Sequence, residues 1–368
     1  MDFYQSLGVT KRINAAACYT ALGGSLMSDE VLAAMNEAAG SFISLHELQE
    51  KAGEKIARLT KNEGAFITTG AAAGIVLSIL ACRTRGDLTE IQKIIDGRAS
   101  DSEVVMFAGQ RIPYDAAIRL AGSKLVTVGD AIQTFEYQLE AGINEKTSAI
   151  FFCAGEHLAT PALSLETTIK IAKKYSVPVI VDAAAQLPPL SNFWKFTKDS
   201  GADLAIFSGG KALHGPQSSG LIVGKKNFIE AVRANGAPYQ RLGRAFKASK
   251  EEIAGLVTAI ELYVNKDHDG EWQKWSTTVN YWLAELAELK GCHIFRDDIN
   301  EAGQPVPRVA IRLLDHSALM IIEKLQKLDP IVEVVHDSRS MIWISPDSLR
   351  PGEEKIVIEQ LRRVLPIK

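Results

Sequence analysis

The sequence predicts an α/β protein with a mostly parallel seven-stranded sheet and a smaller C-terminal α+β domain. Short apolar runs alternate with longer helical patterns through the middle of the chain, and the runs contain no alternating polar residues. Strands of this kind are covered on both faces, as in a parallel sheet between two layers of helices. After about residue 244 the pattern changes, which indicates a second domain. The seven apolar runs are 65–68, 104–107, 125–128, 149–152, 179–181, 204–207 and 221–223.

The remaining elements follow from the same patterns. The last apolar run follows its predecessor after a loop without a helix, so we expect it to lie antiparallel at one side of the sheet. Residues 86–101 are polar and irregular and are interpreted as a surface excursion. In the C-terminal part we expect helices over 250–266, 271–289, 317–328 and 352–365, a strand over 308–314, and a hairpin that joins 331–336 to 341–344.

Three segments make up the predicted domain organisation. Residues 1–40 form an N-terminal arm that packs on the small domain, with a helix that begins after Ser28 as its N-cap. Residues 41–245 form the large domain, and residues 246–368 form the small C-terminal domain.

Composition excludes several classes of protein. The chain has 368 residues and a net charge of −3, with 46% hydrophobic and 23% charged residues, as expected for an ordinary soluble globular chain rather than a nucleic-acid-binding protein. The four cysteines show no zinc-binding spacing and no metal is expected, and we interpret them as reduced core residues of a cytoplasmic protein. We expect no secretion signal, no membrane span and no nucleic-acid partner.

The segment 207–220 carries the main chemical signal. It places Lys211 in a glycine-rich turn between two apolar runs, and Asp182 ends the preceding buried strand. A desolvated lysine is a nucleophilic amine, and a carboxylate at the end of a neighbouring strand can hold a pyridine nitrogen protonated. Together they are the pair that pyridoxal 5'-phosphate requires, with Lys211 forming the Schiff base. Taken singly, Asp182 is also a candidate helix cap, and Lys211 a surface turn residue.

A phosphate site is predicted at Thr69, Gly70 and Ala71, where a strand passes through small residues into a helix. Backbone N–H groups and the helix dipole attract an anion there, and the Thr69 hydroxyl can add a hydrogen bond. The alternative is an ordinary turn between a strand and a helix. We expect Ser208, just ahead of Lys211, to give its hydroxyl to the same phosphate.

These segments resemble the selenocysteine-synthase-like family of fold-type I pyridoxal-phosphate enzymes. Within that family the chain looks most like the D-glucosaminate-6-phosphate ammonia-lyase group. The resemblance runs from about Leu7 to about Leu262 and fades beyond Val264. The resemblance implies that selenocysteine synthases carry an additional N-terminal tRNA-binding region. Because residues 1–4 lead almost directly into the matching segment, we expect no such region here. The matching segments are Arg12-Ile13-Asn14-Ala15-Ala16, residues 45–53, Thr69-Gly70-Ala71-Ala72-Ala73, Ser208-Gly209-Gly210-Lys211 and Gly215-Pro216-Gln217.

Further candidates surround this centre. His214 is either a second acid or base or a histidine satisfied by loop backbone. Tyr114 is predicted to stack on the cofactor ring, or else to pack beside its proline neighbour, and Arg111 can bind an anionic substrate group. Glu156 and His157 occupy another loop at a strand end.

Cations in the linker between the domains suggest a second anion site. Arg244 and Lys247, together with Arg111, carry more positive charge than one cofactor phosphate requires. The alternatives are a solvated face or a site reached from a neighbouring subunit.

One position departs from related enzymes. Trp343 stands where many fold-type I transaminases have the arginine that binds the substrate carboxylate, so an ordinary aminotransferase becomes less favoured. Arg312, Arg339 and Arg350 are candidates to replace that arginine, and the sequence does not choose among them.

The predicted function is α,β-elimination on an anionic amino acid or amino-sugar acid, with release of ammonia and formation of a 2-keto acid. The alternatives are a racemase, aldolase or decarboxylase, and, outside enzymes, a regulatory or scaffolding protein that retains the fold. We expect a homodimer or a higher homo-oligomer.

Overall fold

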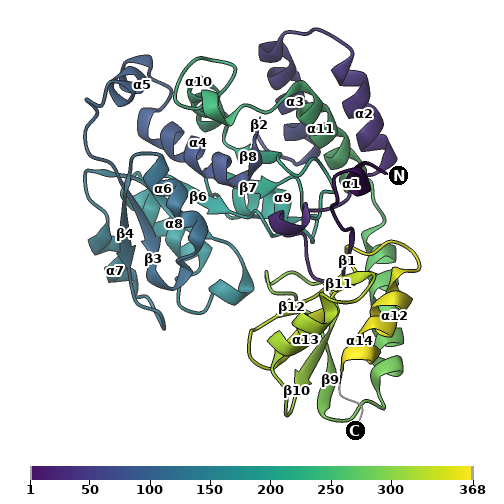
Figure 1. The fold of residues 1–368 in the computed structure, drawn as a ribbon. Helices are drawn as coiled ribbons and strands as arrows, with labels where there is room; N and C mark the ends of the chain where they lie inside the picture. The colour runs from purple at the N-terminus through teal and green to yellow at the C-terminus, as the bar shows by residue number, and fades with distance from the viewer. Residues whose placement is uncertain (1, 366–368) are drawn as a thin grey trace. The chain divides into compact units, whose positions relative to one another are not determined.

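The computed structural model describes residues 2–365, which fall into two units (Figure 1). The larger unit comprises residues 25–266 and 302–304. The smaller unit comprises the described residues of Met1–Gly24, Asp267–Glu301 and Pro305–Lys368. The domain boundaries expected at residues 40 and 245 stay a prediction.

A seven-stranded sheet forms the centre of the larger unit, as predicted. All its strands run parallel except β8, which pairs antiparallel with the strand on each side. β8 was expected at one side of the sheet, but β2 pairs with its outer edge, so β8 is the second strand. In spatial order the strands are β2 (Gly64–Thr68), β8 (Gly220–Gly224), β7 (Leu204–Ser208), β6 (Val179–Asp182), β5 (Thr147–Cys153), β3 (Glu103–Phe107) and β4 (Lys124–Val128).

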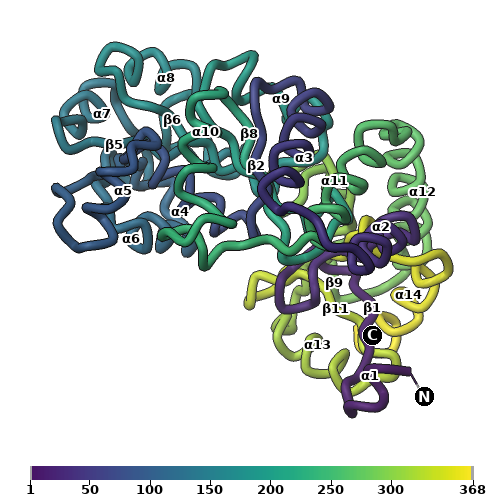
Figure 2. Tube along the Cα trace, turned by 90° about the horizontal axis from the view of Figure 1, so that it is seen from above, coloured from purple at the N-terminus to yellow at the C-terminus, as the bar shows by residue number. Residues whose placement is uncertain are grey.

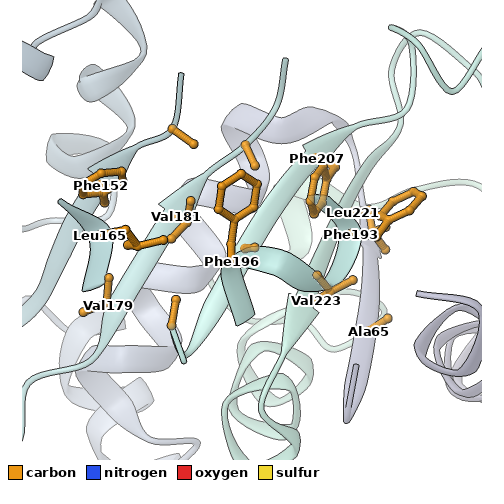
Figure 3. Packing of buried hydrophobic residues seen from close by; sticks show 14 of the residues in the cluster. Ala65, Phe152, Leu165, Val179, Val181, Phe193, Phe196, Phe207, Leu221 and Val223 are labelled. Carbon is orange, nitrogen blue, oxygen red and sulfur yellow. The ribbon is translucent and has the colours of Figure 1, made fainter. Parts of the chain in front are cut away.

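Successive side chains of each strand enter different cores, because side chains alternate between the two faces of a sheet. Val181 and Phe207 belong to one buried cluster (Figure 3), and Ile180 and Ile206 belong to the other. The first face is covered by α3 (Leu45–Leu59), α7 (Glu136–Gly142), α8 (Leu165–Lys174), α9 (Asn192–Trp194) and α11 (Lys250–Val264). The second is covered by α4 (Gly70–Thr84), α6 (Ala116–Leu120) and α10 (Lys226–Asn235).

The edge strand β2 is protected by α3. The Gln49 side chain donates to the Ile67 carbonyl at 2.8 Å and accepts from the Ile67 N–H at 3.4 Å. A Cβ atom at Gly53 would lie 2.5 Å from the Ala65 carbonyl oxygen, so α3 approaches β2 closely only because this residue is glycine. An unprotected edge would offer the same backbone groups to another chain.

The expected surface excursion at 86–101 is wrong in part, because it contains the helix α5 (Leu88–Ile95). The Asp87 carboxylate accepts the N–H groups of Thr89 at 2.7 Å and Glu90 at 3.2 Å, which caps the first turn. Ile91 is 2% exposed and anchors the helix. Interpreting the segment by its polarity alone overlooked this cap and its helical apolar spacing.

The helix predicted after Ser28 is α2 (Asp29–Ala39), and the Ser28 hydroxyl accepts the Val31 N–H at 3.4 Å. In the larger unit, α2 packs along α11 (Figures 1 and 2). Gly255 of α11 allows this contact, since a Cβ there would lie 2.8 Å from the Met35 Cγ.

The smaller unit contains a four-stranded antiparallel sheet in the order β12 (Val335–His336), β13 (Met341–Ile344), β10 (Arg308–Leu313) and β9 (Cys292–Asp297). A second, parallel pair joins β1 (Arg12–Asn14) to β11 (Ile331–Glu333). Neither β9 nor this pair was predicted, and the single strand expected over 331–336 is divided between the two sheets.

In the described part of the smaller unit, α12 packs along α14 (Figure 1). Trp282 is buried in its core and donates its indole N–H to the Glu354 carbonyl at 2.9 Å. Within residues 2–365 no helix combines the length and the apolar character that a membrane crossing requires. The helices are α1 (Phe3–Ser6), α12 (His268–Leu286), α13 (Ala318–Leu325) and α14 (Glu353–Val364).

Candidate active site

The candidate site lies where the parallel strands of the larger unit end. Asp182 is the last residue of β6 and Ser208 the last of β7. Asp182 pairs in register with Cys153 on one side and with Ile206 on the other. Neighbouring strands are roughly 4.8 Å apart, so the residues that leave these strand ends share one edge of the sheet.

A tightly closed loop presents Lys211 at this edge. The Gly209 N–H donates to the Ser219 carbonyl and the Gly215 N–H donates to the Gly209 carbonyl, both at 2.9 Å. A Cβ at Gly209 would lie only 1.9 Å from the Ser219 hydroxyl oxygen, so a larger residue would open the loop. Lys211 is half-buried. The loop therefore fixes the backbone at Lys211 beside the end of β7.

Asp182 is 9% exposed, and its carboxylate accepts the Ala184 N–H at 3.0 Å. Burial raises the pKa of Asp182, while the Ala184 hydrogen bond and the charge of Lys211 offset part of that rise. The influence of Lys211 shows that the two charges lie within electrostatic reach of each other. The structure thus brings together the two residues on which the sequence interpretation depended most.

The start of α4 forms a second part of the site. Gly70 has φ +75°, and a Cβ at Gly220 would lie 2.4 Å from the Gly70 carbonyl carbon, so β8 and α4 approach each other closely. Among residues 2–365 no side chain caps this helix. The amides of Gly70, Ala71 and Ala72 lie in its first turn, where a helix supplies no acceptor of its own. They can therefore receive an anion.

Thr69 is arranged differently from the expectation. Its hydroxyl donates to the Ser218 carbonyl at 3.1 Å, and its N–H donates to the Phe246 carbonyl at 3.3 Å. A contact between this hydroxyl and a phosphate therefore requires its proton to turn away from Ser218. The predicted role of Thr69 stays a prediction.

Two of the predicted cations come close to this helix start. Phe246 ends the short helical turn Arg244–Phe246, and its carbonyl accepts both the Thr69 N–H and the Thr68 hydroxyl. Arg244 and Lys247 flank this contact and are exposed. The tertiary structure thus places a cationic segment beside the turn, although Thr68 and Phe246 are 178 residues apart in the chain.

Arg111 and Tyr114 follow β3. Arg111 pairs with Asp115, which also binds Arg119 at 2.9 Å. Asp115 is buried, but the hydrogen bonds from both arginines outweigh this burial and lower its pKa. The Arg111 side chain keeps 44% exposure, so an external anion has access to it. Tyr114 is 60% exposed, and its stacking role stays a prediction.

His214 is anchored by the backbone, which favours the second of its two interpretations. It has φ +53°, and its Nδ1 donates to the Leu26 carbonyl at 3.0 Å. On the other side of Lys211, the Ser25 N–H donates to the Gly210 carbonyl at 2.9 Å. A carbonyl can only accept, so the Nδ1 of His214 carries a proton. Residues 25–26 thus hold the lysine loop at both ends, a role that the sequence analysis missed.

Residues 302–304 also belong to the larger unit. The Gln186 side chain donates to the Ala302 carbonyl at 2.9 Å. A Cβ at Gly303 would lie 2.9 Å from the Glu156 nitrogen and 3.2 Å from the His157 Nδ1. This short segment therefore covers the loops that follow β5 and β6. Only the Gly303 turn marks it in the sequence.

The family model for SelA, L-seryl-tRNA selenium transferase, matches residues 13–280. This chain belongs to that family. Its relatives include the D-glucosaminate-6-phosphate ammonia lyase of Salmonella typhimurium, which is 36% identical over 99% of this chain and 98% of the relative. The L-seryl-tRNA(Sec) selenium transferase of Clostridium perfringens is 30% identical over 67% of this chain but only 55% of its own length.

Solved structures agree with this membership. A structure of D-glucosaminate-6-phosphate ammonia-lyase superposes on this family member with a TM-score of 0.84 and 31% identity, and covers 99% of this chain and 98% of its own. A structure of SPT with PLP has a TM-score of 0.62 at 15% identity, with coverages of 96% and 87%, and shows the fold alone. Three predictions are thus confirmed: the fold-type I class, membership of the selenocysteine-synthase-like family, and pyridoxal 5'-phosphate as the cofactor.

The residues of this family member fit pyridoxal 5'-phosphate. A buried carboxylate with a raised pKa, Asp182, suits a protonated ring nitrogen, and Lys211 lies within electrostatic reach of it. The uncapped start of α4 suits the phosphate. The bound cofactor supplies an electron sink for charge that develops at the substrate Cα.

Proposed function

We propose that this chain is a pyridoxal-phosphate-dependent lyase that converts an anionic amino-sugar acid, most simply D-glucosaminate 6-phosphate, to a 2-keto acid and ammonia. The observation that carries this proposal is the near-full-length similarity to D-glucosaminate-6-phosphate ammonia lyase, at 36% identity. The arrangement of Asp182 and Lys211 at the sheet edge supports it.

The proposed reaction assigns a task to each residue. Lys211 would supply the amine that holds the cofactor, and its free amine would remove the Cα proton of the substrate. Asp182 keeps the ring nitrogen protonated, and the amides of α4 hold the phosphate. Loss of the Cα proton and the Cβ hydroxyl releases water. The unsaturated amine that remains takes up one water and releases ammonia, which leaves the 2-keto acid.

A product assay tests this proposal. The purified holoenzyme is incubated with D-glucosaminate 6-phosphate, and ammonia and 2-keto acid are measured, with unphosphorylated D-glucosaminate as the matched control. We expect equal amounts of the two products and faster turnover of the phosphorylated substrate. Absence of both products from both substrates would contradict the lyase assignment.

Decarboxylation is the second candidate because one relative is named for it. The 5'-C-glycyluridine monooxygenase-decarboxylase of Streptomyces sp is 29% identical over 98% of this chain and 92% of the relative. A pyridoxal-phosphate enzyme can break different bonds at the substrate Cα, so related chains can catalyse either reaction. Release of carbon dioxide in place of ammonia would select this alternative.

Loss of the cations should weaken binding of a phosphorylated substrate. Each charge-assisted contact contributes about 1.5–3 kcal/mol, so Arg111→Ala and Lys247→Ala should each raise KM about tenfold or more. Steady-state kinetics measure this effect, and the visible spectrum of the bound cofactor should stay unchanged. Arg119→Ala is the matched control, because Arg119 binds the same Asp115 carboxylate. Unchanged KM in both variants would make the cationic residues a solvated or interface feature.

We propose a homodimer or larger assembly in the cytoplasm. Phe42 and Ile43, between α2 and α3, are 107% and 51% exposed, which supports contact with another subunit. Sedimentation of the holoenzyme should show a homo-oligomer, and an active monomer at assay concentration would disprove the assembly.

The free cysteines support a reducing compartment such as the cytoplasm, and the net charge of −3 argues against a nucleic-acid partner.

A further inference from the structure

Arg308, the first residue of β10, is 6% exposed, and no other lysine or arginine in the part of the chain that the structure describes is buried. A buried charge is costly unless it is paired. Asp297 lies directly opposite in β9, and its carboxylate accepts from the Arg308 Nε at 3.1 Å and Nη2 at 2.9 Å. This two-bond pair already neutralises the guanidinium.

Trp343 holds the face of the same guanidinium. Ala310 lies opposite Trp343 in the β10–β13 register, and Arg308 is two residues from Ala310 on the same face of the strand. The guanidinium carbon of Arg308 lies 5.1 Å from the centre of the Trp343 ring. Asp297 and Trp343 thus fix the arginine, and its Nη1 atom points to a different partner.

That partner is Glu301, whose carboxylate accepts from Nη1 at 3.0 Å. Glu301 lies outside regular structure, and its side chain is 32% exposed. The pKa of Tyr19 is raised to about 12, first by burial and then by the charge of Glu301. The Tyr19 hydroxyl therefore lies beside the Glu301 carboxylate. Arg308 and Tyr19 therefore surround one carboxylate that solvent can reach.

The charge balance shows that Glu301 is surplus. The pKa of Asp347 is raised to about 6, mainly by burial and further by the nearby charges of Glu301 and Glu271. A hydrogen bond from the Ser345 hydroxyl lowers the pKa and offsets part of this rise. Two carboxylates, those of Asp297 and Glu301, thus share one guanidinium. Asp297 is sufficient to neutralise it, and the additional charge of Glu301 acts unfavourably on Asp347.

We infer that Arg308, Trp343 and Tyr19 form a carboxylate-binding site of the smaller unit, in which Glu301 is an internal occupant that a substrate carboxylate replaces. This inference rests on the proposed function, in which an amino-sugar acid supplies the carboxylate. Exchange of one carboxylate for another leaves the charge around Arg308 unchanged. Arg308 would then replace the transaminase arginine that Trp343 excludes, a residue that the sequence analysis sought at Arg312, Arg339 and Arg350.

The competing explanation is a structural ion-pair network that joins β9 to β10. The two explanations differ for Glu301. In a binding site, removal of its charge frees Arg308 for a ligand and raises carboxylate affinity. In a structural network, the same change lowers only the unfolding temperature.

Two ligands that differ only in the carboxylate test the inference. Binding of D-gluconate 6-phosphate and D-glucitol 6-phosphate to the holoenzyme is measured by calorimetry for wild type, Arg308→Lys, Glu301→Gln and the control Arg363→Lys, which changes an exposed arginine of the same unit. We expect Arg308→Lys, which loses the planar fork, to reduce the preference for the carboxylate ligand about tenfold or more. Glu301→Gln should increase that preference roughly fivefold, because a like charge is removed. The control should match wild type.

Malonate protection against thermal unfolding separates this inference from the proposed function. If neither sugar phosphate binds but malonate still stabilises wild type and Glu301→Gln more than Arg308→Lys, the substrate assignment fails and the carboxylate site stands. If the ligand preference and the malonate effect are the same in wild type and Glu301→Gln, the site is overturned. Glu301→Gln decides the question even if Arg308→Lys does not fold, since Glu301 is partly exposed.

Discussion

Lys211→Ala is expected to abolish turnover and to remove the visible absorbance of the lysine-bound cofactor, while the protein folds normally. The lysine is the proposed covalent anchor of the cofactor and also the group that moves the Cα proton, so its loss removes two functions at once. The loop itself should persist, because backbone hydrogen bonds of Gly209 and Gly215 and the contacts of residues 25–26 hold it.

The measurements are the absorbance spectrum, borohydride trapping of the cofactor on the protein, and turnover. Lys226→Ala is the matched control, because Lys226 is an exposed lysine of the same unit and lies outside the sheet edge. A fully active Lys211→Ala enzyme would end the assignment of Lys211.

Asp182→Asn is expected to retain the cofactor but to lose about 100-fold or more in kcat. Its carboxylate places a negative charge beside the ring nitrogen, and preorganised charges of this kind contribute that order of rate acceleration. Asparagine keeps the shape of the side chain, so cofactor affinity measured by titration of the apoprotein should change much less than kcat.

The stability of the apoprotein provides a second readout. Because the folded-state pKa of Asp182 is raised above its unfolded value, its contribution to stability is fully present below the unfolded pKa and is lost as pH rises through the folded pKa. At neutral pH the buried charge is therefore unfavourable. Asp182→Asn should leave the unfolding temperature of the apoprotein equal or higher. A large fall in that temperature, or a kcat near the wild-type value, would contradict the proposed role.

The local sequence pattern was sufficient to predict the strands of the sheet in the larger unit. All seven apolar runs are strands, because residues such as Val181 and Ile180 are buried on opposite faces and the sequence must be apolar at both. β9 escaped prediction because its residues are half-buried or exposed, so no apolar run marks it. The short pair β1–β11 joins segments about 320 residues apart, and such pairing leaves no local signal.

The sequence by itself determined where the residues at the ends of strands lie relative to one another. Asp182 ends one buried strand and Lys211 follows another. Parallel strands end at one edge of a sheet, so the proximity of the two residues follows from local pattern alone. Only the tertiary structure decided which backbone groups hold His214, which segment lies beside Thr69, and which arginine contacts Trp343. Those contacts join residues distant in the chain. They are set by strand register and loop closure, which depend on the packing of the complete fold.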